Sequence, residues 1–289
     1  MTFDDRIAQR FADISPAEQR VVRFFQHHRE EVLIASASAM ASKAKTSDAT
    51  VVRAARSLGY SGLDALRRAL AQEMRGNLSP ADRLSRTLDV VGGSAAAAFQ
   101  TTIETHLECL QRLSSSIAPK HFEDAVGAII AARRVVVFGI GPSSAMANYF
   151  VIQLGRFGID AISLTNTGRL FADDLMRLRG GDLVIIFAYG RVYPELRAVL
   201  DAAKELRLRT MLVTDTLAVT LKRRVEMVLS VPRGRSDMLS MHTATLGFIE
   251  ALLVGAAASR PEETLSSLRK LNMARNKLAG KATKPRPGA

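Results

Sequence analysis

Residues 36–60 read SASAMASKAKTSDATVVRAARSLGY, a pattern that predicts two short helices joined by a tight turn. In the first half, small or apolar residues recur at the spacing of one helix face, at Ala37, Met40, Ala41 and Ala44. Lys45 and Thr46 then interrupt the pattern and mark the turn. A first helix could bury this face, and we expect the segment to lie in an all-α domain.

The second half of the segment has the signals of a helix start and a helix end. Ser47 can cap the helix by accepting a backbone N–H bond, and Asp48 favours the first turn through the helix dipole. Gly59 is suited to end the helix. The expected buried stripe consists of Val51, Val52, Ala55 and Leu58. The residues expected to face outward are Ser47, Asp48, Thr50, Arg53 and Ser57.

Hydroxyl and basic side chains gather around the start of this second helix, an arrangement that suits reading of the DNA major groove. We expect Thr50 and Arg53 to lie near bases or phosphates. The full set of candidate DNA-binding residues is Lys43, Lys45, Thr46, Ser47, Asp48, Thr50, Arg53, Arg56 and Ser57. An ordinary helical hairpin with a solvated face is the alternative, because helix-turn-helix spacing is easily mimicked.

The charge balance favours a polyanionic partner only in part. The chain has 40 Lys and Arg against 28 Asp and Glu, a formal net charge of +12 and a pI near 10.4. Residues 260–289 hold 8 basic and 2 acidic side chains, so half of the excess lies at the C-terminal end. Residues 36–77 hold 7 basic and 3 acidic side chains, which is a modest phosphate-binding footprint and not a polycationic arm.

Length and composition exclude several classes of protein. With 289 residues, 47% of them hydrophobic, the chain can bury two cores. The single cysteine, Cys109, excludes an internal disulfide and a thiolate zinc cluster. The five histidines show no ligand spacing, so we expect neither a metal nor a cofactor. The charged N-terminus lacks a signal-peptide core and no apolar run is long enough to span a membrane. We therefore expect a cytoplasmic protein with no membrane partner.

Helix signals also surround the opening segment. Ser15, Pro16 and Glu18 form the pattern of a cap, a first-turn proline and a capping box. Gly76 and Asn77 mark a boundary after a further expected helix.

From about residue 95 the sequence alternates between helical segments and short β-branched runs. The expected strands are 135–138, 161–164, 183–187, 210–214 and 227–231, and the expected helices are 96–114, 119–132, 243–258 and 262–278. This alternation is typical of an α/β domain with a five-stranded parallel sheet covered by helices on both faces. The expected organisation is a helix-turn-helix domain at 1–77, a linker at 78–94, an α/β effector-binding and dimerisation domain at 95–278, and a disordered basic tail at 279–289.

A glycine-rich turn follows the first expected strand and precedes a helix expected from about Ala145. Gly139 and Gly141 let the backbone approach an anion, and the hydroxyls of Ser143 and Ser144 add donors. The spacing matches neither the dinucleotide fingerprint nor the P-loop. A purely structural tight turn fits the pattern equally well.

Two stretches resemble a known family. The recognition-helix pattern of RpiR-type bacterial transcriptional regulators is matched at Ser47, Thr50, Val51, Arg53, Leu58, Gly59, Tyr60, Ser61 and Gly62. Downstream, VVVFGIGPSSAMA and the strand–helix series resemble the SIS (sugar isomerase) domain that these regulators carry, which recognises phosphosugars. The resemblance implies a SIS-like α/β domain, with double-stranded DNA and a small anionic sugar-derived effector as partners.

The resemblance has one departure. SIS domains that hold a phosphosugar usually carry Ser-x-Ser-Gly followed by Ser or Thr after the central strand, whereas residues 188–193 read AYGRVY. Arg191 could contact an anion bidentately instead. The candidate ligand-binding residues are Gly139, Gly141, Ser143, Ser144, Tyr189, Arg191 and His242. A different acidic metabolite, or an empty pocket, is the alternative to a phosphosugar.

The leading hypothesis is a DNA-binding transcriptional regulator, without catalytic residues, that is controlled by a sugar phosphate or another acidic carbohydrate-derived metabolite. The chief competitor is a SIS-type sugar-phosphate isomerase, which needs a positioned base such as His242 or Glu195. We expect His242 instead to cap or hydrogen-bond at the start of its helix. A helical adaptor is disfavoured by the run from Ser47 to Arg53. The apolar segment 243–258 should be buried or at a subunit interface, so we expect a homodimer or homotetramer.

Overall fold

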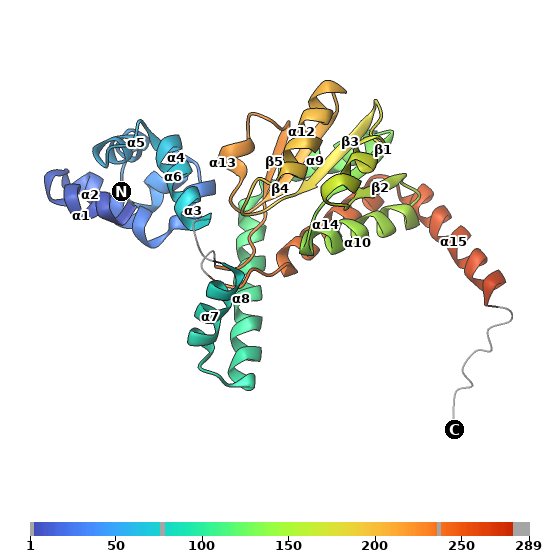
Figure 1. Cartoon of the computed structure of the whole chain (residues 1–289), viewed down its shortest axis with the longest axis horizontal. Helices are drawn as coiled ribbons and strands as arrows, with labels where there is room; N and C mark the ends of the chain where they lie inside the picture. Colours follow the sequence, from blue (N-terminus) through green and yellow to red (C-terminus); the bar gives the residue numbers. More distant parts are fainter. Residues whose placement is uncertain (1–2, 76–78, 236–237, 280–289) are drawn as a thin grey trace. The chain divides into compact units, whose positions relative to one another are not determined.

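The computed structural model describes residues 3–75, 79–235 and 238–279 (Figure 1). The chain divides into two compact units. The first consists of residues 1–118, 188–197 and 212–248, and the second of residues 119–187, 198–211 and 249–289. Among the described helices, none combines the length and the apolar composition that a membrane span requires.

Helices alone form the N-terminal part of the first unit. They are α1 (Phe3–Arg10), the 3-10 turn η1 (Phe11–Asp13), α2 (Pro16–His27), α3 (Arg29–Ile34), α4 (Ala37–Lys43), α5 (Asp48–Ser57) and α6 (Leu63–Arg75). Their apolar faces share one core, whose fully buried side chains include Phe3, Val21, Phe25, Met40, Val51, Leu58, Leu66 and Leu70. The predicted all-α domain is confirmed.

The start of α2 shows how local sequence signals fix a helix end. Glu18 N–H donates to Ser15 Oγ at 3.4 Å, and Ser15 N–H donates to Glu18 Oε2 at 3.1 Å. These two bonds satisfy backbone donors that have no partner inside the helix. The predicted capping box is confirmed. The hydrogen bond with the Ser15 side chain is also the largest cause that lowers the pKa of Glu18.

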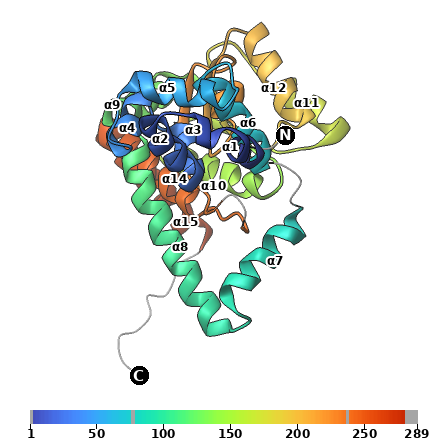
Figure 2. The ribbon, with the colours of Figure 1, turned by 90° about the vertical axis from the view of Figure 1, so that its left-hand side faces the viewer.

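Two helices follow the helical core in the first unit. α7 (Pro80–Val91) ends at Gly92, and α8 (Ala95–Ser116) begins after Ser94. Gly92 and Gly93 have φ angles of +68° and +75°, which glycine adopts without steric cost. Figure 2 shows the two helices diverging from this turn. The predicted boundary residues Gly76 and Asn77 lie outside the described residues.

A five-stranded parallel sheet has the strand order β2-β1-β3-β4-β5. The strands are β1 (Arg134–Phe138), β2 (Ala161–Leu164), β3 (Asp182–Phe187), β4 (Arg209–Thr214) and β5 (Met227–Ser230). Each predicted strand is confirmed to within one residue at either end. β1 pairs with β2 and β3, so Phe138 lies opposite both Leu164 and Ile186. The strand order reverses between β1 and β3, the kind of position where α/β sheets bind ligands.

Helices alternate with these strands. They are α9 (Pro119–Ala131), α10 (Pro142–Arg156), the 3-10 turn η2 (Gly168–Leu170), α11 (Phe171–Leu175), α12 (Pro194–Glu205), α13 (Ala218–Leu221), α14 (Thr243–Ser259) and α15 (Pro261–Leu278). α10 packs on β1, β2 and β3, and Figure 1 shows it alongside the sheet. The predicted tail is described only at Ala279; residues 280–289 lie outside the described part of the chain.

The apolar segment predicted at 243–258 is α14, and one face of it is buried. Its buried side chains include Ala244, Phe248, Ile249, Leu252, Leu253 and Ala256. A Cβ atom at Gly255 would lie 2.8 Å from Val126 Cγ2, so glycine here permits the close approach of α9. Val254, by contrast, is 68% exposed. The predicted burial is confirmed for the inner face.

Candidate functional site

A tight turn sets the position of α5 after α4. Thr46 N–H donates to Ala41 O at 2.9 Å, and Lys45 N–H donates to Ser42 O at 3.2 Å. Lys45 has a φ of +49°, a left-handed conformation that is uncommon outside glycine. Arg20 Nη2, from α2, donates to the Lys45 carbonyl oxygen at 3.4 Å. The predicted turn is confirmed, and Arg20 is a basic neighbour that the sequence pattern did not single out.

α5 begins with the predicted cap. Thr50 N–H donates to Ser47 Oγ at 3.3 Å, and both Ser47 and Asp48 are exposed at this helix start. Val52 was predicted in the buried stripe, but it is only half-buried. The apolar residues that are buried here are Val51, Ala54, Ala55 and Leu58.

The prediction that Thr50 faces outward is wrong. Thr50 is only 4% exposed, because it lies one helical turn before Ala54 on the buried face of α5. Thr50 Oγ1 is 2.9 Å from Ser47 Oγ and accepts a hydrogen bond from Arg53 Nη2 at 3.2 Å. Thr50 is therefore placed to orient Arg53.

The remaining predicted DNA contacts divide by exposure. Thr46 is half-buried, and the half-buried Ser57 donates through Oγ to Glu18 Oε1 at 3.1 Å. The exposed basic residues of the set are Lys43, Lys45, Arg53 and Arg56. Lys43 forms an ion pair with Glu31 of α3. The exposed start of α5 thus combines a serine hydroxyl, an aspartate carboxylate and several cationic groups, which can contact both phosphates and base edges.

The glycine-rich turn begins α10 one turn earlier than predicted, at Pro142 instead of about Ala145. Proline suits the first position of a helix, and Gly141 enters it with a φ of +57°. A Cβ atom at Gly139 would lie only 2.5 Å from the Ser143 carbonyl oxygen. Gly139 is therefore required for the close packing of this helix start.

The two serines of this turn point to different surroundings. Ser143 is buried, at 7% exposure, whereas Ser144 is half-buried and donates through Oγ to Gly141 O at 2.7 Å. Close packing at Gly139 and the positive φ of Gly141 explain both glycines as parts of a tight turn, without a ligand. The start of α10 still presents the positive end of a helix dipole, which favours an anion.

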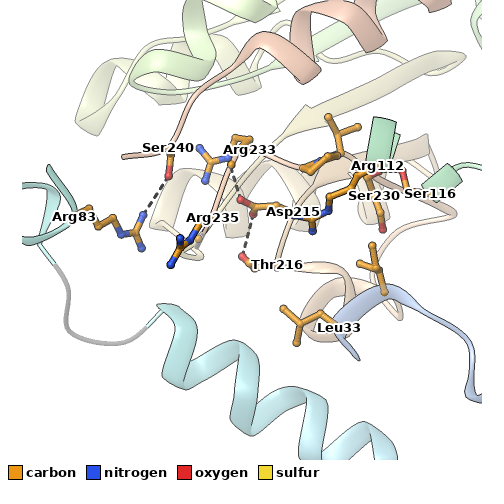
Figure 3. Close-up of a pocket in the computed structure, with 15 residues that line it drawn as sticks. Leu33, Arg83, Arg112, Ser116, Asp215, Thr216, Ser230, Arg233, Arg235 and Ser240 are labelled. Atoms are coloured by element: carbon orange, nitrogen blue, oxygen red, sulfur yellow. Dashed lines mark hydrogen bonds and ion pairs between the residues drawn. The ribbon is translucent and has the colours of Figure 1, made fainter. Parts of the chain in front are cut away.

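A buried polar cluster lies in the first unit around Tyr189. The Tyr189 hydroxyl is 2.9 Å from Thr245 Oγ1, and His242 Nδ1 is 3.4 Å from the same oxygen. The Arg233 guanidinium lies over the Tyr189 ring, 4.0 Å from its centroid. Arg233 Nε donates to Asp215 Oδ2 at 3.0 Å (Figure 3). His242 therefore hydrogen-bonds at the start of α14, as predicted.

Burial governs the titration of this cluster. Burial raises the pKa of the Tyr189 phenol. It lowers the pKa of His242 from 6.5 to about 4, with the Arg233 charge as the next cause. A neutral imidazole at physiological pH results, which is a weak base compared with one whose pKa is near 7.

The loop after β3 places Arg191 on the surface. Gly190 has a φ of +70°, and Arg191 N–H donates to Tyr189 O at 2.8 Å, so the chain reverses sharply here. Arg191 is exposed whereas Tyr189 is buried. Sequence reasoning missed Asp215 and Arg233, although both follow strands at the edge where ligands bind. Inspecting the ends of β4 and β5 in the same way as those of β1 and β3 would have found them.

Two family models match the chain. The model described as "Helix-turn-helix domain, rpiR family" matches residues 1–77, and the model described as "SIS domain" matches residues 128–255. "Bifunctional protein glk" of Burkholderia orbicola is 28% identical over 259 residues, which cover 89% of this chain. The chain spans 40% of the length of that relative. "Uncharacterized HTH-type transcriptional regulator YbbH" of Bacillus subtilis is 23% identical over 90% of this chain and 92% of its own length.

Solved structures show the same folds. The sugar isomerase domain of an RpiR transcription factor from Sphaerobacter thermophilus is 29% identical, with a TM-score of 0.55, over 59% of this chain and 96% of that chain. The Vibrio vulnificus NanR protein, solved with ManNAc-6P, is 20% identical, with a TM-score of 0.57. That likeness covers 96% of this chain and 100% of NanR, so the fold is shared over nearly the whole length.

Proposed function

We propose that this chain, which belongs to the RpiR-type helix-turn-helix regulators that carry a SIS domain, binds a specific DNA operator through α5. The observation that carries the proposal is the exposed start of α5, held by the α4–α5 turn and bordered by Lys45, Arg53 and Arg56. This arrangement suits a recognition helix whose first turn enters the major groove.

Each exposed group at the start of α5 has a role in this proposal. Arg53 reads a guanine edge or holds a phosphate, and Thr50 limits its conformations through the hydrogen bond to Oγ1. Lys45 and Arg56 contact phosphates, which positions the helix but carries no sequence information. Asp48 can accept a hydrogen bond from the amino group of cytosine.

We further propose that a sugar phosphate or another acidic carbohydrate-derived metabolite controls DNA binding. A protein of similar fold, NanR of Vibrio vulnificus, was solved with ManNAc-6P, which supports a ligand of this class. One group of candidate contacts is the turn with Gly139, Gly141, Ser143 and Ser144, at the positive end of α10. Tyr189, Arg191 and His242 form a second group, in which Arg191 is the exposed cation.

The proposed organisation keeps the boundaries expected from the sequence: a DNA-binding domain at 1–77, a linker at 78–94, an effector-binding domain at 95–278 and a basic tail at 279–289. We propose that the chain forms a homodimer or homotetramer. Large apolar side chains exposed on α7 and α8 support this assembly: Leu84, Leu88, Val90, Phe99, Ile103, Leu107 and Leu110. They are a better interface candidate than α14, whose large apolar side chains are buried or half-buried except for Val254.

The chemistry of His242 fits a regulator without catalytic activity better than it fits an isomerase. Aldose–ketose isomerisation needs a base whose pKa lies near the working pH. Burial holds the pKa of His242 near 4, and its Nδ1 faces Thr245. We therefore propose that the chain is a regulator and not a sugar-phosphate isomerase.

The test is effector-dependent operator binding by the full chain. Operator DNA is first selected from a random duplex library, and its affinity is then measured against a panel of sugar phosphates and sugar acids. We expect at least one compound to change the affinity, because a ligand shifts the equilibrium only by its differential affinity for the two states. Operator affinity that no compound in the panel alters contradicts control by this class of effector. Conversion of any compound to its isomer contradicts the proposal that the chain is not an enzyme.

A further inference from the structure

The segment from residue 264 to residue 289 is strongly basic. It holds seven Lys and Arg and no Asp or Glu, whereas residues 1–263 hold 33 basic and 28 acidic side chains. More than half of the net charge of +12 therefore comes from this segment. Four of the seven cations lie on the described helix α15: Arg269, Lys270, Arg275 and Lys277. We call residues 269–289 the basic arm.

The second half of α15 is exposed on all sides. The first half is held by its own unit: Thr264 is buried, and a Cβ atom at Gly158 would lie 3.2 Å from Ser267 Cβ. From Asn272 to Ala279, by contrast, every residue is exposed. Figure 1 shows α15 running outward from the sheet and the helices beside it. Packing within the unit therefore does not explain the residue types in this half of the helix.

The four cations on α15 have no acidic partner. None of their side chains forms an ion pair or a hydrogen bond with another residue that the structure describes. Exposed helix faces are stabilised by opposite charges three or four residues apart, but no Asp or Glu lies at these spacings from any of the four. The helix dipole favours Arg275 and Lys277 in the last turn, but it does not account for Arg269 and Lys270.

Neither of the two matching family models reaches this segment. The models end at residues 77 and 255, and α15 begins at Pro261. The helix-turn-helix core and the α/β fold therefore do not require the positive charge of the basic arm. Unpaired charge of one sign on an exposed helix is complementary to a polyanion.

We propose that the basic arm is a second DNA-binding element, which holds the phosphate backbone of a duplex without reading its sequence. Duplex DNA carries one negative charge per about 1.7 Å of its axis. The helix from Arg269 to Lys277 is about 12 Å long, which matches several phosphates. Arg269, Lys270 and Lys277 lie within about one third of the helix circumference, so one side of α15 can contact the backbone at three points.

The apolar side chains of α15 favour DNA over a lipid surface as the polyanion. A helix that lies in a membrane interface buries one continuous apolar face. Leu265, Met273 and Leu278 are the exposed large apolar side chains of α15, and their spacing places them on different sides of the helix. The proposed function already brings the chain to duplex DNA, and the choice of DNA as the partner rests on it.

The test compares the affinity of full-length variants for a duplex of random sequence, by fluorescence anisotropy over a range of salt concentrations. The arm variant carries Arg269→Gln, Lys270→Gln, Arg275→Gln and Lys277→Gln, and glutamine keeps a similar helix propensity. The control variant removes four exposed cations that lie outside the arm: Arg169→Gln, Arg197→Gln, Lys204→Gln and Arg207→Gln. Both variants therefore lose the same net charge.

We expect the arm variant to bind the random duplex about tenfold or more weakly than the wild-type chain at about 50 mM NaCl. The slope of log affinity against log salt should shrink by about three, since each phosphate contact contributes about 0.9. The control variant should keep the wild-type slope. Equal changes in the two variants, or an unchanged slope in the arm variant, overturn the proposal.

Lysine footprinting gives a readout that does not depend on the folding of a variant. The wild-type chain is acetylated with and without the random duplex, and the modified lysines are identified by mass spectrometry. We expect DNA to protect Lys270 and Lys277 and to leave Lys204 on α12 unchanged. Equal protection of all three lysines, or no protection of Lys270 and Lys277, contradicts binding by the arm.

Two further comparisons separate this proposal from its neighbours. Binding of the wild-type chain to phosphatidylserine vesicles, together with no binding to the random duplex, would replace DNA by a lipid surface and overturn the proposal. On a selected operator the arm variant should lose the same factor as on the random duplex, because phosphate contacts carry no sequence information. A chain that prefers its operator but shows no arm-dependent slope overturns the arm and leaves the proposed function intact. Arm-dependent binding without operator preference supports the arm and contradicts recognition by α5.

Discussion

Thr50 and Arg53 lie one turn apart on α5, and the hydrogen bond between them joins a buried hydroxyl to an exposed guanidinium. Long arginine side chains lose rotamer freedom when they bind, which opposes affinity. The hydrogen bond to Thr50 already limits the rotamers of Arg53 in the free protein, so less side-chain entropy is lost on binding. In the proposed complex with DNA, the buried Thr50 would therefore contribute to recognition through the position of Arg53.

Replacing Arg53 separates base reading from phosphate contact. If Arg53 reads a guanine edge, Arg53→Ala should weaken operator binding by about 1–3 kcal/mol and relax specificity at one base pair. If it holds only phosphate, all sequences should lose affinity equally and the salt slope should shrink by about one. Fluorescence anisotropy at several salt concentrations distinguishes the two, with the exposed Arg197→Ala as the control. Unchanged affinity at every salt concentration removes Arg53 from the interface.

His242 predicts a pH dependence of stability. Burial lowers its pKa in the folded chain from 6.5 to about 4. Between these values the unfolded chain binds a proton here that the folded chain does not, so stability is full above pH 6.5 and falls as the pH is lowered toward 4. His242→Asn should therefore lose less stability than the wild-type chain when urea unfolding is compared at about pH 7 and pH 5. An identical loss in both chains contradicts the buried neutral imidazole.

At the scale of elements, the junction between β1 and α10 depends on close backbone packing. In Gly139→Ala the new Cβ would lie 2.5 Å from the Ser143 carbonyl oxygen, so we expect a loss of about 1–3 kcal/mol in the free energy of unfolding. Gly127→Ala, in α9, is the matched control, because its Cβ would meet no atom within 4 Å. That control should gain about 0.5–1 kcal/mol from helix propensity. Equal stability of the two variants argues against a packing role for Gly139.

The elements differ in how far sequence alone predicts them. The strands β1, β3 and β4 were predicted closely because they are apolar runs buried on both faces, the pattern that is typical of a parallel sheet. The capping box at Ser15 and the helix end at Gly59 follow from local rules, so they were also predicted. The burial of Thr50 was missed because the choice between two adjacent helix faces depends on packing partners. Asp215 and Arg233 come together only in the fold, and no spacing in the sequence connects them.

For the whole molecule, the apolar side chains exposed on α7 and α8 predict self-association. Leu107 is 55% exposed, in line with Ile103 on α8, and a charge at this position should disfavour burial against a second copy. Sedimentation at micromolar protein should show a dimer or tetramer for the wild-type chain and a smaller species for Leu107→Glu. The exposed Gln111→Glu is the control for added charge. A wild-type monomer, with and without DNA, contradicts the proposed assembly.

The central claim is sequence-specific DNA binding by the exposed start of α5, and operator selection tests it most directly. The full chain is used to enrich duplexes from a random library, and the affinity of the enriched site is compared with that of a scrambled site at one salt concentration. We predict an inverted repeat, with half-sites spaced by about one or more helical turns, that is bound about 10³-fold or more tightly than the scrambled duplex. No enriched sequence, or equal affinity for both duplexes, would contradict the account.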